Sequence, residues 1–164
     1  MSEKSPTEYW KAPEVEAVAK KLIATAHRRL NDVRIDYYFR SDTPVSKGKY
    51  LTAITKKVTT LTSEMANNNG EPFFCIVVAE PAWKLISEKQ REAVIDHELC
   101  HCEVKTIEGE IKLKLLPHDL QEFNAVVRRH GAYDEDLQKF LQAAHESTLP
   151  TLFDDKEEED KEAA

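Results

Sequence analysis

The chain of 164 residues is 41% hydrophobic, which is enough for one domain with an ordinary core. Its net charge of −7 comes mostly from residues 154–164, where seven acidic residues and two lysines contribute −5 and leave −2 for residues 1–153. The nearly neutral body lacks the basic face of a nucleic-acid-binding protein, so we do not expect nucleic acid as a partner. No apolar run approaches the roughly 18 residues of a membrane span, so we do not expect the chain to cross a membrane.

The first half of the chain contains one predicted helix and three predicted strands. Residues 1–11 are polar, and we expect them to be disordered. Pro13 suits a first helical turn, and apolar residues then recur every three or four positions, which predicts an amphipathic helix that ends near Asn31. Alternating apolar residues, and an apolar run rich in β-branched and aromatic residues, predict strands at residues 33–40, within 51–61 and at 73–79.

A capping box marks the start of a second helix. Ser87 is followed three residues later by Gln90, a pair that can satisfy two backbone N–H groups at a helix N-terminus. Apolar residues mixed with charges continue over residues 88–104, and no Gly or Pro interrupts them. We therefore expect a helix over this range.

The rest of the chain is predicted to hold a hairpin, two helices and a tail. Alternating segments on both sides of Glu108-Gly109 indicate the hairpin, and apolar periodicity indicates the helices, the first of which would end at Gly131. The predicted elements are a hairpin over residues 106–116, helices over 118–129 and 134–145, and an acidic disordered tail over 151–164.

Within the second helix, the sequence H-E-x-x-H at residues 97–101 has the spacing of a zinc site. Residues four apart on a helix share one face, about 5–6 Å between their Cβ atoms, so the ring nitrogens of His97 and His101 can converge on one ion. A catalytic zinc site takes three protein ligands and keeps one position for water. Glu98 would flank the ion and accept the proton of that water as general base.

A third ligand is expected from the segment after the hairpin. His118 follows a hairpin that reverses the chain, which lets it approach the first two histidines, and it is our first choice. Glu122 lies one helical turn later and is the alternative, since carboxylates also bind zinc. Asp119 or Glu122 would also accept the second ring N–H of a ligating histidine.

The other histidines and the cysteines are not expected to bind the ion. Three cysteines are an odd number for a disulfide framework, which favours a reducing compartment and, with no leader sequence visible, the cytosol. Cys100 and Cys102 are interpreted as small buried residues, because side chains two apart on a helix diverge by about 200°. His130 is expected to interact with a helix C-terminus, and His27 and His145 to be solvated helix residues.

One residue and four segments follow one another along the chain in the order typical of a known protein family. They are Arg40 and residues 73–83, 96–102, 117–123 and 126–131. In these segments the chain resembles the family named "putative phage metallopeptidase", small zincin-like proteins of phages and prophages. More distantly, it is similar to SprT-like compact zincins. The resemblance implies a zinc-dependent peptidase with His97 and His101 as helix ligands, Glu98 as base and His118 as third ligand.

The combined prediction is an α+β, zincin-like domain over residues 12–150. A small mixed or antiparallel sheet would pack against the helix of the motif, with further helices near both ends of the chain. A metal-activated water would hydrolyse a peptide or protein substrate, bound extended beside the strand at residues 73–79 if that strand is an exposed edge. Tyr50 and Tyr133 are candidates for stabilising the oxyanion, but neither belongs to a recognisable motif. The alternative is a catalytically inert zinc-binding protein that acts as a protein-interaction module.

Overall fold

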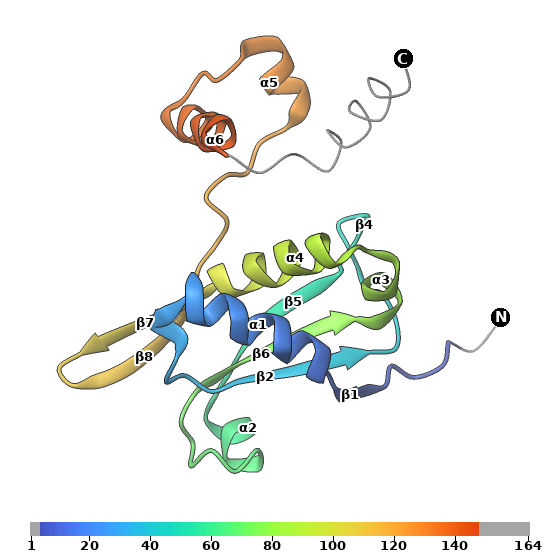
Figure 1. Cartoon of the computed structure of the whole chain (residues 1–164), viewed down its shortest axis with the longest axis vertical. Helices are drawn as coiled ribbons and strands as arrows, with labels where there is room; N and C mark the ends of the chain where they lie inside the picture. The colour runs from blue at the N-terminus through green and yellow to red at the C-terminus, as the bar shows by residue number, and fades with distance from the viewer. Residues whose placement is uncertain (1–3, 148–164) are drawn as a thin grey trace. The chain divides into compact units, whose positions relative to one another are not determined.

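The computed structural model describes residues 4–147, which form two compact units that divide between Pro117 and His118 (Figure 1). These residues form a mixed α+β structure of six α-helices, a four-stranded mixed sheet and two hairpins, which confirms the predicted fold class at that level. No helix among them has the length and apolar character to cross a membrane. The predicted tail at residues 151–164 lies outside the described residues, and the single domain over residues 12–150 stays a prediction.

Four strands make up the sheet of the first unit: β1 (Tyr9–Lys11), β2 (Ile35–Arg40), β5 (Ala53–Val58) and β6 (Phe73–Ala79). Their order across the sheet is β1-β2-β6-β5. β2 and β6 run parallel, whereas β1 with β2 and β5 with β6 are antiparallel pairs. β5 is therefore an edge strand of this sheet, and β6 is an interior one.

β6 lies at the centre of the core, as its apolar run predicts. Phe74, Ile76 and Val78 on this strand are fully buried. Because β2 and β5 are hydrogen-bonded to its two sides, β6 has no exposed edge. The condition for binding a peptide beside this strand is not met, and that part of the sequence interpretation is wrong.

The N-terminal segment is partly ordered. Residues 1–11 are predicted to be disordered because they are polar, but Tyr9–Lys11 forms β1 and pairs with the end of β2. The prediction is wrong for these three residues. The rings of Trp10 and Phe39 pack with 6.2 Å between their centroids. Such a contact between residues remote in sequence orders a segment that the average polarity of residues 1–11 does not mark as structured.

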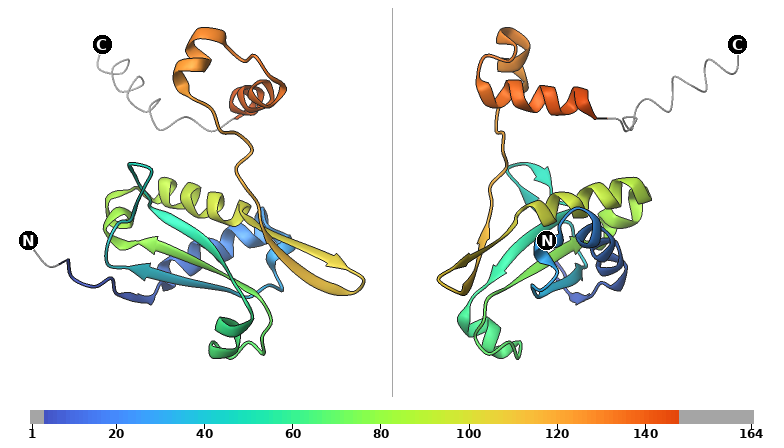
Figure 2. Two further views of the ribbon diagram at one scale, coloured as in Figure 1. Left: turned by 180° about the vertical axis from the view of Figure 1, so that it is seen from behind. Right: turned by 60° about the vertical axis from the view of Figure 1, so that its left-hand side comes forward.

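Helices α1 (Pro13–Thr25) and α4 (Glu88–Cys100) cover one face of the sheet (Figure 1 and Figure 2). On α4, Ile95 and Leu99 are fully buried in the core, as is Val15 on α1. Burying one large aliphatic side chain stabilises a fold by about 1.5–3 kcal/mol. These few contacts therefore place α4 firmly, although most of its remaining residues are charged or polar.

Two helices of the first unit are shorter than the sequence predicts. α1 ends at Thr25 and is followed by the short 3-10 helix η1 (Arg28–Leu30). α4 ends at Cys100, because the chain from residue 102 onward is β7 (Cys102–Ile107), which pairs with β8 (Glu110–Leu115). The β-branched residues of this stretch favour an extended backbone once a partner strand is present. The turn of this hairpin at Glu108-Gly109 is as predicted, with φ values of 52° and 82°.

The first unit contains further short elements that the sequence did not indicate. Trp83 from one of them is buried in the core and contacts Phe39, with 6.1 Å between the ring centroids. These elements are β3 (Val45–Ser46), β4 (Lys49–Tyr50), α2 (Thr60–Met65) and α3 (Glu80–Leu85).

The second unit contains α5 (Asn124–His130) and α6 (Glu135–Glu146). The helix predicted from residue 118 begins only at residue 124. The backbone N–H of Phe123 donates to Glu122 Oε1 at 2.7 Å, so a local side-chain bond replaces the helical one. α5 ends at His130, and Gly131 is its C-cap with a φ of 68°, as predicted. Asp134 caps α6 by accepting a hydrogen bond from the N–H of Leu137 at 2.8 Å.

Candidate metal centre

The last turn of α4 places His97 and His101 beside each other. The predicted capping box between Ser87 and Gln90 starts the helix, with both of its hydrogen bonds formed. The two imidazole rings lie 5.0 Å apart between centroids, and their Nε2 atoms are 3.3 Å apart. Two nitrogens that each lie about 2.0–2.1 Å from a tetrahedral ion are about 3.3 Å from one another. The pair therefore already has the separation of two zinc ligands.

The hydrogen bonds of His101 determine which of its nitrogens faces His97. Its Nδ1 is 2.6 Å from the carbonyl oxygen of Leu116, and the N–H of Leu116 donates to the carbonyl of His101 at 2.8 Å. A carbonyl oxygen can only accept, so Nδ1 carries the hydrogen and donates it. Such a bond fixes both the ring orientation and the tautomer, in which Nε2 carries a lone pair and no hydrogen.

His118 completes a group of three histidines. Each of His97, His101 and His118 offers one ring nitrogen, and the three nitrogens lie within 4.8 Å of one another. His118 is the first residue after Pro117 and follows Leu116 by two positions, so the reciprocal hydrogen bonds between Leu116 and His101 tether it near the pair. These three histidines form a group that could hold a metal ion, and their role as ligands stays a prediction.

Glu98 is buried beside the pair, with 6% of its surface exposed. The hydroxyl of Thr55 on β5 lies 2.5 Å from Glu98 Oε2 and 3.2 Å from the carbonyl oxygen of Glu98. Thr55 itself is 9% exposed. Thr55 could not be recognised from the sequence, because nothing in a lone threonine on an alternating strand indicates a partner 43 positions away.

A shallow pocket of about 310 Å³ opens next to the motif. One side comes from the end of β4 and the start of β5, and the other from α4. Its lining is mostly apolar apart from the two motif residues: Tyr50, Leu51, Thr52, Ala53, Ala93, Val94, His97 and Glu98. Of the two tyrosines suggested for the oxyanion, Tyr50 lines this pocket, whereas Tyr133 belongs to the second unit and donates to Glu122.

A family model described as "Putative phage metallopeptidase" matches residues 7–145. The chain belongs to this family. The match confirms the resemblance on which the sequence analysis relied and includes the motif helix, the hairpin and both helices of the second unit. A search of curated proteins and a search of solved structures found no match.

In this member of the phage metallopeptidase family, Arg29 fastens the C-terminus of the motif helix. Its guanidinium donates to the carbonyl oxygens of Leu99 and Cys102, both at 3.0 Å, and its Nη1 lies 2.9 Å from His27 Nδ1. His27 is buried and its Nε2 lies 2.6 Å from Asp96 Oδ1, so the prediction of a solvated His27 is wrong. Carbonyls of the last helical turn lack intrahelical partners, and a cation is well suited to them.

A second group that can in principle hold a metal, His27, Asp96 and Cys100, lies next to this network. Because Arg29 has only hydrogens to donate, His27 Nδ1 must accept, and His27 Nε2 then donates to Asp96. Both ring nitrogens are engaged, and a guanidinium cation lies against the group. We conclude that this network supports the motif helix and is not a cation site.

The cysteines differ from the prediction in one respect. Cys102 is buried, as expected, and burial raises the pKa of its thiol to about 12. Cys100 is exposed, so its interpretation as a buried residue is wrong. Because α4 ends at Cys100, the two side chains lie on different elements and not on one helix.

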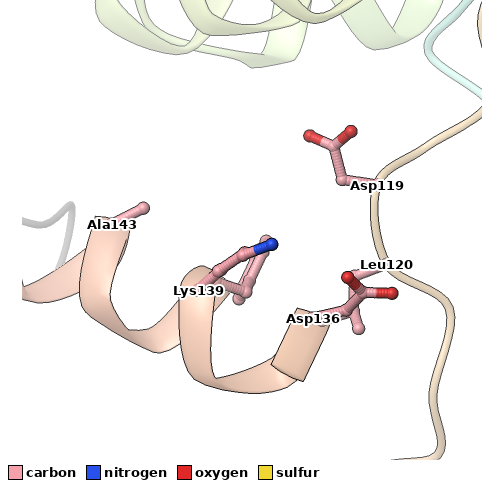
Figure 3. Close-up of a pocket in the computed structure, with 6 residues that line it drawn as sticks. Asp119, Leu120, Asp136, Lys139 and Ala143 are labelled. Carbon is pink, nitrogen blue, oxygen red and sulfur yellow. The ribbon is translucent and has the colours of Figure 1, made fainter. Parts of the chain in front are cut away.

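Glu122 is not a member of either group of possible metal ligands among the described residues. Its carboxylate accepts hydrogen bonds from the Tyr133 hydroxyl and from the N–H of Phe123, which lower its pKa. Asp119 lines a separate pocket of about 290 Å³ within the second unit (Figure 3). There its carboxylate lies across from Asp136 and Lys139 of α6, and no histidine lines that pocket.

Proposed function

We propose that this protein is a zinc-dependent metallopeptidase with a zincin-like active site. The observation that carries the proposal is the 3.3 Å separation of the Nε2 atoms of His97 and His101, next to the buried carboxylate of Glu98. Membership of a metallopeptidase family supports the same activity.

The donor set suits zinc. Three imidazoles are a common set of protein ligands for a catalytic zinc ion, which keeps its fourth position for water. His101 would bind through Nε2, since Leu116 accepts the hydrogen of its Nδ1. His97 and His118 would supply the other two nitrogens. When bound, zinc acts as a Lewis acid that acidifies a water molecule and polarises a carbonyl group.

In this proposal Glu98 handles the proton. Its carboxylate accepts a proton from the attacking water and returns it to the leaving amine as the peptide bond breaks. Burial against β5 holds this carboxylate beside the pair of histidines and limits its contact with bulk water. Tyr50, which lines the adjacent pocket, is positioned to contact the substrate.

The substrate would bind along β5. This strand is an edge of the sheet, and Thr55 on it contacts Glu98. An extended peptide can pair with an exposed strand edge through main-chain hydrogen bonds, which are independent of side-chain sequence. β5 thus takes the role that the sequence analysis gave to residues 73–79, and the apolar pocket at its start would receive one side chain of the peptide.

The test compares the wild-type protein with Glu98→Gln. We expect equal zinc stoichiometry by elemental analysis, and a fall in hydrolysis of a quenched fluorescent peptide library by about 10²–10⁴-fold in the variant, the usual contribution of a general base. Equal hydrolysis by both proteins would contradict the proposal. If both bind zinc and neither cleaves any peptide, the protein is instead an inert zinc-binding interaction module.

A further inference from the structure

The contact between Thr55 and Glu98 joins the edge of the sheet to the motif. A hydroxyl carries one hydrogen, and here it has two possible acceptors on the same residue. The hydroxyl oxygen lies 2.5 Å from Glu98 Oε2 and 3.2 Å from the backbone carbonyl oxygen. The hydroxyl therefore donates its hydrogen to the carboxylate. Both residues are buried, so this hydrogen bond lies in a region of low dielectric, where it is stronger than it would be in water.

The position of Thr55 on β5 follows from the alternation of side chains along the strand. Side chains two apart point to the same face of a sheet, so Ala53 and Thr55 share the face that carries α4. Ala53 lines the pocket beside the motif, and Thr55 reaches Glu98. One face of β5 therefore forms a wall of the pocket and also contacts the carboxylate, while the backbone of the same strand forms the sheet edge.

We propose that Thr55 is a positioning residue, which holds the Glu98 carboxylate in one orientation with respect to β5. One carboxylate oxygen is tied to the strand, and the other is the oxygen that takes the proton. This inference rests on the proposed function, since it gives the orientation a use. It also implies that the peptide and the base are aligned by the same strand, so that Glu98 keeps its place relative to the peptide bond.

The physical reason lies in the freedom of a glutamate side chain. Glutamate has three rotatable bonds and loses considerable rotamer entropy when it is held in one geometry. A buried hydrogen bond from a strand that is itself paired to β6 provides that restraint before substrate binds. A displacement of about 1 Å in a reacting group can cost about 100-fold in rate.

Two substitutions of Thr55 separate the hydroxyl from the side-chain volume. Thr55→Val keeps the shape and removes the hydroxyl, whereas Thr55→Ser keeps the hydroxyl and removes a methyl group. In the zinc-loaded full chain we expect kcat to fall by about 10- to 100-fold in Thr55→Val with KM changed less than about threefold, and Thr55→Ser to keep wild-type kcat within about threefold. Thr106→Val, an exposed position on β7, is the matched control and should behave as wild type.

A second measurement does not depend on turnover. The mobility of the Glu98 side chain is measured by ¹³C relaxation in protein labelled at glutamate, with the signal assigned by its loss in Glu98→Gln. We expect Thr55→Val to lower the order parameter of this side chain, and Thr55→Ser and Thr106→Val to leave it at the wild-type value. Zinc content should be the same in all of these proteins.

The outcomes are distinguishable. If the wild-type protein cleaves no peptide but the mobility pattern is as expected, the proposed function fails and the positioning role of Thr55 stands. If Thr55→Val has wild-type mobility at Glu98, or if Thr55→Ser is as impaired as Thr55→Val, the positioning role is overturned. Loss of zinc from Thr55→Val would also overturn it, because the residue would then act on the histidines.

Discussion

His97 and His101 lie on a helix that is fastened at both ends, whereas His118 lies on an irregular segment that follows Pro117. The helix begins at a capping box, buries Leu99 in the core and ends where Arg29 donates to the carbonyl of Leu99 and to that of Cys102 at the start of β7. The segment after Pro117 has no helix before residue 124, and His118 is exposed. The difference teaches that two of the proposed ligands are held in place before an ion binds, while the third depends on a short tether to Leu116.

Removing one ligand from each region is the strongest test of this comparison. We expect His97→Ala to weaken zinc binding by more than about 100-fold, beyond the 10- to 100-fold typical of residues that only support a ligand. His118→Ala should also weaken it, by a smaller factor, because a less ordered ligand contributes less net free energy once its ordering cost is included. The measurement is competition with a chromophoric chelator.

Glu122→Ala is the matched variant for the disputed third ligand. Because Glu122 is outside the histidine group and is hydrogen-bonded to Tyr133, we expect its removal to leave zinc affinity unchanged. The third ligand would be the carboxylate if Glu122→Ala weakened zinc binding as strongly as His118→Ala, or if Glu122→Ala weakened it and His118→Ala did not.

Loosening the fastened region has the next largest expected effect. Arg29→Met removes the donor to the carbonyls of Leu99 and Cys102 and to His27. Hydrogen bonds from charged groups contribute about 1.5–3 kcal/mol, and partial solvent exposure reduces this, so we expect a loss of about 1–2 kcal/mol in unfolding free energy by urea titration.

Arg28→Met is the control for that variant. The side chain of Arg28 donates to the carbonyl of Ala24 in the preceding helix α1 and not to α4, so its loss should have little effect on stability. Zinc affinity should fall several-fold in Arg29→Met and remain unchanged in Arg28→Met. Only Arg29 donates to the carbonyls of Leu99 and Cys102, the residues on either side of Cys100 and His101. Equal effects of the two substitutions would show that Arg29 does not fasten the helix.

The smallest expected effect concerns the second unit alone. The hydrogen bond from Tyr133 holds the pKa of Glu122 below its ordinary value. A carboxyl group whose pKa is lower in the folded state adds stability above its unfolded pKa, and loses that contribution as the pH falls through the folded pKa. Tyr133→Phe removes this hydrogen bond, so it should raise the pKa of Glu122 toward its ordinary value and reduce that contribution to stability. The pKa is measured by a ¹³C-detected pH titration. An unchanged titration would show that the bond does not form in solution.

Local signals in the sequence were sufficient for much of the first unit. The capping box at Ser87 determined where α4 begins, because its bonds join residues only three apart. The run at residues 73–79 identified β6, and Glu108-Gly109 identified the turn between β7 and β8. The spacing of His97 and His101 predicted that the two rings would meet, since helix geometry alone brings residues four apart together.

Contacts between segments that are distant in the sequence were decided by the tertiary structure alone. The bond between Thr55 and Glu98 spans 43 residues, and that between His27 and Asp96 spans 69. The interior place of β6 and the early end of α4 both depend on which strands pair, which periodicity along one strand does not encode. Sequence thus determined the helix that presents the histidines, because its signals are local, and packing determined what surrounds Glu98, because a side chain finds its buried partner only when the chain is folded.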